Sequence, residues 1–365
     1  MHGQPLRTRP MVYGTTFEPT LSERQAMVLR ALVSTYVERA GPVASQVLAV
    51  QMPVPLSSAS IRNTLAELQE AGLVEKAHAS SGRVPTPLGL RTFIDHLLEP
   101  ADLGPDDQRQ LDRALAGVDT SETPRLAAQV LSDRTRQLGF VVPPRVEQLL
   151  LRTVHLVPVG TGRVLAVLVA ENGGVMQRIV AHEERISRRE LERIGRILAE
   201  RVAGRTLVGL RQCLEAERER LRGEADDFLR RAWMFGLGAC ESEAGEDLVI
   251  ATRLALLAQP EFSDPERIRG LFSALETNER LLELLRQIAR ADRGAVRVGL
   301  SMSLETELGE PSLRDCALVA VAYGSSSEPG ATGVLGVIGP QRMDYGRVIP
   351  LVHYCSELVT RKLMV

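Results

Sequence analysis

Apolar positions between residues 21 and 98 follow helical spacing three times and then give way to short extended runs. The first helix is predicted over 22–39, where apolar residues recur at i, i+3, i+4, i+7 and i+8: Leu29, Leu32, Val33, Tyr36 and Val37. Gly41 and Pro42 end this helix. A short second apolar face follows at 43–48, and the prolines behind it require a turn. A third helix therefore starts at Ser57 or Ser58.

The third predicted helix has two different faces. Ile61, Leu65 and Leu68 share its apolar side, and the opposite side carries small and polar residues: Ala59, Arg62, Asn63 and Ala66, with Ser60 and Glu67 beside them. Small residues around one Arg and one Asn allow a helix to enter a major groove, where Arg pairs with guanine and Asn with adenine. A solvated helix face is the alternative interpretation.

The segment at 73–86 predicts a hairpin after this helix. Two short extended runs flank a tip at 78–83, where Gly82 supplies permissive backbone. Hydroxyls and Arg83 at such a tip suit phosphate contacts or insertion into a minor groove. An exposed loop arginine and an ordinary exposed His78 are the alternatives. Three helices followed by a hairpin predict a winged helix-turn-helix over 21–100.

Charge gives this DNA-binding hypothesis no support in bulk. Residues 21–100 contain seven basic residues (Arg24, Arg30, Arg39, Arg62, Lys76, Arg83 and Arg91) and seven acidic ones (Glu23, Glu38, Glu67, Glu70, Glu75, Asp95 and Glu99). Most DNA-binding domains carry a clear basic excess. Affinity must therefore depend on where the charges lie, on helix N-termini and on two copies binding one operator.

The rest of the chain alternates between strand and helix patterns after a linker at 101–110 and a helical stretch to about Leu138. Runs typical of strands lie at 149–159, 163–172, 174–181, 295–302, 316–324 and 333–339. Helices are predicted over 187–202 and at about 345–363. This order looks like a GAF-like α+β domain in two parts, 101–205 and 294–365.

A mainly helical insertion, 206–293, separates the two parts. Asp264 and Pro265 give the N-cap and N1 proline of one of its helices. The insertion has more apolar side chains than the core of one small domain needs. Four residues are therefore candidates for dimerisation: Trp233, Phe235, Leu281 and Leu285. The alternative is that these side chains fill the insertion's own core.

Composition excludes several classes of protein. The 365 residues, 44% of them hydrophobic, are enough for two or three domains. No run reaches the ~18 apolar residues of a membrane span and no signal peptide is apparent, so we expect a cytoplasmic protein with a disordered tail at 1–20. The four cysteines lie far apart, which indicates reduced thiols and neither a disulfide framework nor a metal site. Nucleotide-binding and hydrolase motifs are missing, so no enzyme and no cofactor is expected.

Four segments together resemble the HrcA family of heat-inducible transcription repressors. They are LSERQAMVLRALVSTYVERAGPVASQVLA, LSSASIRNTLAELQEAGLVEKAHASSGRVPTPLGLRTFIDHLL, QPEFSDPERIR at 259–269 and GVLGVIGPQRMDYGRVIPLV at 333–352. The resemblance covers nearly everything after residue 20. Ala44 stands where Gly is usual, Ser60 where Thr is usual, and the stretch at 251–257 departs from the family pattern.

The resemblance implies a homodimeric repressor that binds an inverted-repeat operator of the CIRCE type upstream of chaperonin and DnaK-type genes and is inactivated by heat. It also implies dimerisation through the inserted domain and dependence on a GroEL-type chaperonin. The candidate DNA contacts are Ser45, Gln46, Ser57, Ser58, Ser60, Arg62, Asn63, His78, Ser80, Ser81 and Arg83. The alternative is a ligand-sensing winged-helix regulator that binds a small molecule in its GAF-like domain.

Overall fold

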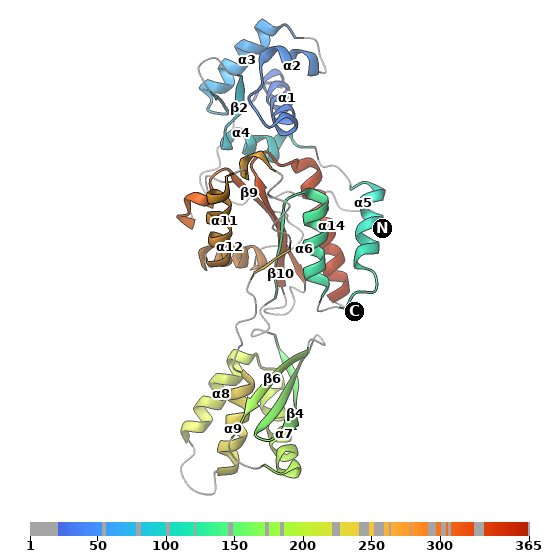
Figure 1. The fold of residues 1–365 in the computed structure, drawn as a ribbon, viewed down its shortest axis with the longest axis vertical. Coiled ribbons are helices and arrows are strands. Elements are labelled where there is room, and N and C mark those ends of the chain that lie inside the picture. The colour runs from blue at the N-terminus through green and yellow to red at the C-terminus, as the bar shows by residue number, and fades with distance from the viewer. Residues whose placement is uncertain are drawn as a thin grey trace. The chain divides into compact units, whose positions relative to one another are not determined.

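A computed structural model gives the fold of the protein (Figure 1). It describes residues 21–52, 56–77, 82–99, 103–119, 122–144, 149–171, 175–182, 186–220, 227–240, 248–251, 259–262, 264–277, 279–290, 297–300, 304–305, 308–324 and 332–363. The chain forms two units. The first comprises 1–142, 248–323 and 334–363, and the second is built on 143–247 with the short pieces 324–333 and 364–365. The predicted tail at 1–20 lies outside the described residues.

Three helices open the first unit, and their ends follow from local capping. Helix α1 (Glu23–Arg39) starts with a capping box, in which Ser22 and Gln25 each bind the other's backbone N–H. It ends at Ala40, which has left-handed backbone geometry. Helix α2 (Ser45–Gln51) is short, and α3 (Ser58–Glu70) begins at the N-cap Ser57. These bounds confirm the three helices that the apolar spacing predicts.

A two-stranded antiparallel hairpin follows, with β1 (Val74–Lys76) paired to β2 (Arg83–Pro85). A bridge ties the loop after α1 to this hairpin, because Val43 and Arg83 exchange backbone hydrogen bonds of 2.9 Å in both directions. Gly82 is needed for this approach: a Cβ there would lie 2.3 Å from the Val43 carbonyl oxygen. The reason for this glycine is thus close backbone packing, and its φ is not among the positive values of the described residues.

Four helices follow the hairpin among the described residues and lead into the body of the first unit, where the last of them packs on the sheet. They are α4 (Pro87–Thr92), the single-turn π-helix η1 (Phe93–Leu97), α5 (Pro105–Leu115) and α6 (Thr123–Thr135). Thr86 caps α4 by accepting from the Gly89 N–H at 3.0 Å, and Pro87 occupies the first helical position. Helix α5 begins inside the segment expected to be a linker, because Pro105 and the acidic residues behind it suit a helix N-terminus.

The body is a five-stranded sheet between two layers of helices (Figure 1). Its strands lie in the order β7-β3-β10-β9-β8: β7 (Val249–Ile250), β3 (Leu138–Val142), β10 (Thr332–Pro340), β9 (Cys316–Gly324) and β8 (Arg297–Leu300). Helices α6 and α14 (Tyr345–Leu363) cover one face, and α11 (Pro265–Thr277) and α12 (Glu279–Arg290) cover the other. Alternate strand residues supply the two cores, as the pleat of a sheet requires. Short 3-10 turns at Pro260–Phe262 and Pro311–Leu313 flank α11.

The second unit is a separate α+β fold. Strands β4 (Leu151–Gly160), β5 (Arg163–Ala170) and β6 (Val175–Ala181) form the antiparallel meander that the sequence predicts. Helices α7 (Arg188–Val202), α8 (Leu207–Arg220) and α9 (Asp227–Cys240) share one apolar core with its inner face. Side chains on the outer face of the sheet stay exposed, among them Val157 and Ile179.

The predicted domain boundaries are wrong in one respect. The insertion is the unit built on 143–247 and not 206–293, so the meander belongs to it, and helices α11 and α12 belong to the body. The body also contains β3, which begins at Leu138, where the predicted helical stretch ends, and covers residues that the sequence pattern leaves unassigned. Strand β3 pairs with β10, which lies far away in the sequence, and no local pattern indicates such a partner.

The four cysteines are free, as predicted. Burial raises the pKa of the Cys240, Cys316 and Cys355 thiols to about 12, so these groups stay protonated at neutral pH. No helix in the described part of the chain is long and apolar enough to span a membrane.

We expect Gly82→Ala to lower the free energy of unfolding by about 1–3 kcal/mol, because the new Cβ displaces the Val43–Arg83 bridge. Denaturant unfolding measures the change. Gly195→Ala is the matched control, since nothing lies within 4 Å of that position in α7, and it should raise stability by about 0.5–1 kcal/mol. Equal stability of Gly82→Ala and wild type would contradict the role assigned to the close approach.

Candidate nucleic-acid interface

Helix α3 presents an exposed face with two unengaged polar side chains. Ile61, Leu65 and Leu68 are buried against α1 and α2, while Arg62 and Asn63 point to solvent. The Arg62 Nε donates to the Ser58 carbonyl oxygen at 3.3 Å. Its terminal nitrogens and the Asn63 amide have no partner among the described residues. Both groups are therefore available to a ligand without breaking an internal contact.

The N-terminus of α3 lies against that of α2. Ser57 caps α3, since its Oγ accepts from the Ser60 N–H at 3.1 Å. The hydroxyls of Ser45 and Ser58 are 3.4 Å apart, while Gln46 is exposed on α2. The structure thus brings these candidate residues together at one end of α3. Ser57 also has a structural role there, because it is the N-cap of the helix.

Glu67, an acidic residue beside the exposed face of α3, is bound by two side chains of α1. Arg24 donates to the Glu67 carboxylate at 3.1 Å, and the Gln25 amide donates to it at 3.0 Å. These contacts compensate the negative charge of Glu67 and fix the side chain beside α1. The Arg62 end of α3 is left without a neighbouring carboxylate in its own first turn.

The hairpin contributes one described candidate residue. Arg83 is half-buried, and its Nε is buried without a partner in the described part of the chain. His78, Ser80 and Ser81 lie outside the described residues. A buried guanidinium nitrogen with no acceptor is costly, so Arg83 is the hairpin residue with the clearest need for an anionic partner.

Ion pairs engage only part of the charge in this formally neutral region. Three of its basic residues are paired: Arg24 with Glu67, Arg30 with Glu99 and Arg91 with Asp95. Four have no ion pair among the described residues: Arg39, Arg62, Lys76 and Arg83. Three of these four lie on α3 and the hairpin, as do two of the four acidic residues without an ion pair in the described part of the chain, Glu70 and Glu75. Binding of an anion therefore depends on the exposed donors of individual side chains and not on a local excess of positive charge.

The residues expected to mediate dimerisation are interior. Trp233 and Phe235 are each 2% exposed in the core of the second unit, and Leu281 and Leu285 are 2% and 0% exposed beneath the sheet of the first. These four side chains fill the cores of their own chain, which was the alternative interpretation. Large apolar side chains at helical spacing indicate burial but not whether a partner chain supplies it.

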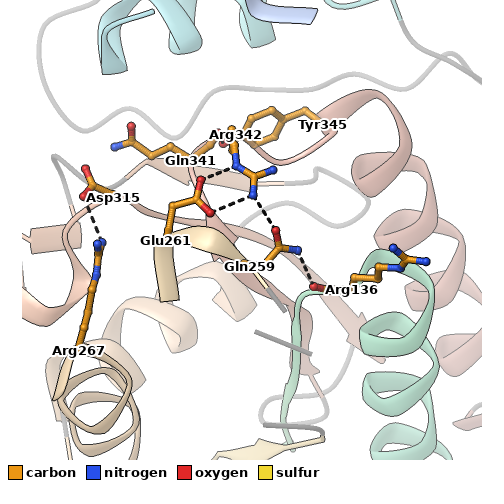
Figure 2. A network of polar contacts seen from close by, with 8 residues as sticks. All are labelled: Arg136, Gln259, Glu261, Arg267, Asp315, Gln341, Arg342 and Tyr345. Carbon is orange, nitrogen blue, oxygen red and sulfur yellow. Dashed lines mark hydrogen bonds and ion pairs between the residues drawn. The ribbon is translucent and has the colours of Figure 1, made fainter. Parts of the chain in front are cut away.

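A polar network joins two of the segments that carry the family resemblance (Figure 2). Arg342 makes a bidentate ion pair with Glu261, and its Nη2 donates to the Gln259 Oε1 at 2.8 Å. The Gln259 amide in turn donates to the Arg136 carbonyl oxygen at 3.2 Å. Figure 2 also shows Arg267 paired with Asp315 at 3.1 Å. Sequence reasoning identified both segments by resemblance and did not predict that they meet.

This network faces α1. Burial, followed by the Glu261 and Asp315 carboxylates, raises the pKa of Tyr36 above its ordinary value, while Arg342 lowers it. The Tyr36 hydroxyl therefore stays neutral within the electrostatic field of the network. The helix that carries Tyr36 also holds Glu67 of α3, so the network and the exposed face of α3 are connected through α1.

Comparison with known proteins identifies the family. A family model described as "HrcA protein C terminal domain" matches residues 122–349. The heat-inducible transcription repressor HrcA of Xylella fastidiosa (strain M12) is 34% identical over 344 residues, which cover 94% of this chain and 96% of that protein. The protein of the same name from Nitratidesulfovibrio vulgaris (strain DSM 19637 / Miyazaki F) is 35% identical over 349 residues, with the same coverage. The chain belongs to the HrcA family of heat-inducible transcription repressors.

A solved structure shares the fold. A crystal structure described only as that of a hypothetical protein aligns with a TM-score of 0.64 and 22% identity, covering 94% of this chain and 99% of the other. At this identity the likeness concerns the fold alone.

Proposed function

We propose that this protein represses heat-shock chaperone operons by binding a CIRCE-type inverted repeat as a homodimer, with α3 in the major groove. The observation that carries the proposal is the exposed face of α3, on which Arg62 and Asn63 have free hydrogen-bonding groups. Arg suits guanine O6/N7 and Asn suits adenine N6/N7. Ala59 and Ala66, both exposed on the same face, leave room for the groove walls.

The first three helices and the hairpin then form a winged helix-turn-helix, with the hairpin as its wing. The Val43–Arg83 bridge fixes the hairpin beside the start of α2. Arg83 and Lys76 carry the unpaired positive charge of the wing, and a backbone phosphate would satisfy the buried Arg83 Nε. These contacts supply affinity without sequence information, while α3 supplies the base readout.

We assign dimerisation to the outer face of the sheet in the second unit. Val157, Leu165 and Ile179 lie opposite one another across the three strands, and Val157 and Ile179 are 45% and 59% exposed. Val175, 58% exposed, extends the patch. A two-fold axis places the same patch on both subunits, so an apolar sheet face is complementary to itself, and two subunits match the two half-sites of an inverted repeat.

Regulation by heat follows, in this proposal, from dependence on a GroEL-type chaperonin. The body assembles its sheet from strands on both sides of the insertion, so a long loop must close before β3 can pair with β10. Slow closure prolongs the exposure of apolar strands such as β9, all of whose residues are buried in the finished fold. Unfolded proteins produced by heat compete for the chaperonin and reduce the supply of active repressor.

Arg62→Ala and Asn63→Ala should each lower discrimination between operator and mismatched DNA by about 1–3 kcal/mol, since each removes one bidentate base contact. Competition gel shifts measure the effect, and circular dichroism checks the fold. Gln69→Ala is the matched control: Gln69 is exposed on the same helix, two turns closer to its C-terminus, and this variant should keep wild-type specificity. Unchanged specificity in both α3 variants would refute the assigned face.

Ile179→Glu should convert the dimer to a monomer and weaken operator binding, because a desolvated carboxylate in an apolar interface has no partner. Sedimentation velocity gives the oligomeric state. Val208→Glu provides the control: it places the same charge on a 47% exposed apolar position of α8, on the helical side of the unit, and should leave the dimer intact. A dimeric Ile179→Glu variant excludes the sheet face as the interface.

Protein diluted from denaturant should recover operator binding several-fold better with chaperonin and ATP than without, and the difference should grow with temperature and protein concentration. Operator binding after a fixed refolding time is the readout. Equal recovery across these conditions would remove the chaperonin from the proposal and leave the DNA-binding assignment standing.

A further inference from the structure

A cavity of about 200 Å³ lies in the first unit where four segments meet: the C-terminal end of α6, the N-terminal end of α14, the segment at Gln259 and the α1 residue Val37. Its lining is unusually basic, with three arginines and one carboxylate. The residues that matter for its chemistry are Arg134, Gln137, Gln259, Arg342, Asp344 and Arg347.

Two of the arginines have unused hydrogen-bond donors. Arg134 and Arg347 approach the same carboxylate, that of Asp107, at 3.7 and 3.8 Å. Neither guanidinium makes a hydrogen bond to another described residue. One negative charge is therefore shared by two cations, and their N–H groups remain available to an acceptor in the cavity.

The third arginine is already committed. Arg342 is 13% exposed in its side chain, and its Nε and Nη2 are engaged by Glu261 and Gln259, which fixes the guanidinium in the cavity wall (Figure 2). Asp344 is committed as well, because its carboxylate accepts from the Arg347 backbone N–H at 3.3 Å at the start of α14. A backbone hydrogen bond does not cancel the charge of Asp344, so Arg134 and Arg347 are balanced by the Asp107 and Asp344 carboxylates. The cavity therefore offers unused donors but no net positive charge.

An unpartnered polar side chain completes the site. Gln137 is 6% exposed, its Oε1 is buried without a partner, and no other described residue binds its side-chain amide. Its backbone is fixed, since Ser132 Oγ donates to the Gln137 carbonyl oxygen at 2.7 Å. The amide fits only because residue 339 is glycine: a Cβ there would lie 2.0 Å from the Gln137 Oε1. The Gln137 side-chain nitrogen has no partner among the described residues and remains available as a donor to a ligand in the cavity.

We propose that this cavity binds a phosphate group, either free or as a phosphomonoester. Arg134 and Arg347 supply guanidinium donors, and the Gln137 side-chain nitrogen supplies one further donor.

The position of the cavity gives the ligand a route to regulation. Val37 belongs to α1, and every other residue of the lining belongs to the body, so a bound phosphate contacts both. The charges of the Arg342–Glu261 pair act on the pKa of the neighbouring Tyr36, which Glu261 raises and Arg342 lowers. A ligand that stabilises this joint is linked to DNA binding through α1, a consequence that rests on the proposed function, whereas the site itself does not.

The test is calorimetric titration of the full-length protein with inorganic phosphate, in buffer matched for ionic strength with chloride. We expect saturable binding of phosphate by the wild type and at least about tenfold weaker binding by Arg347→Gln and Arg134→Gln. Arg125→Gln is the matched control, because Arg125 is exposed at the other end of α6 and lies outside the cavity.

Gln137→Met tests the amide separately, and it should weaken phosphate binding less than the two arginine variants do, since it removes one uncharged donor. Thermal melts without phosphate show whether each variant is folded. Binding that is absent in the wild type, or that Arg347→Gln and Arg134→Gln both retain, overturns the proposal. Operator binding is measured in phosphate-free buffer, so a wild-type protein that binds phosphate but no operator refutes the proposed function and not this site.

Discussion

The pairing of β3 with β10 is the constraint on which the rest of the structure depends. Residues 138–142 lie antiparallel to residues 334–338, and the whole second unit is built from the chain between them. Once these strands pair, α6 before β3 and α14 after β10 lie on the same face of the sheet (Figure 1). The insertion can then vary without disturbing the body, since its core of strands and helices is closed in itself. The same pairing places the end of α6 beside the start of α14, where the basic cavity lies.

Sequence reasoning predicted those features that depend on local chemistry. Ser57, Ser22 and Pro265 mark helix starts because caps act within one turn, and α3, the meander and α14 follow from periodicity over their own length. The features it missed are those that depend on distant partners. The sequence pattern leaves β3 unassigned, places the insertion too late in the chain and assigns Trp233 to a surface although this side chain is buried. The apolar character of a residue does not say which surface covers it.

The candidate DNA contacts show the same division. That Arg62 and Asn63 face outward could be predicted, because the opposite positions of α3 are apolar. That Glu67 is compensated by Arg24 could not be, since the two residues lie on different helices. This long-range pair compensates the carboxylate beside the exposed Arg62–Asn63 face of α3. Among the described residues, Glu70 on α3 and Glu75 on β1 have no ion pair, so the neutral charge balance of the region is unchanged.

The segment around residues 339–345 gains a physical explanation from the structure. Gly339 leaves room for the Gln137 amide, Arg342 holds the turn at Glu261, and Asp344 caps α14. The Tyr345 hydroxyl donates to the Gln341 carbonyl oxygen at 2.7 Å and closes the loop between β10 and α14. Each residue thus acts on the position of the α14 N-terminus and on the charges around it. Tyr36 lies in the field of these charges, so the environment of α1 depends on the same turn. A segment far from α3 can therefore influence DNA binding without contacting DNA.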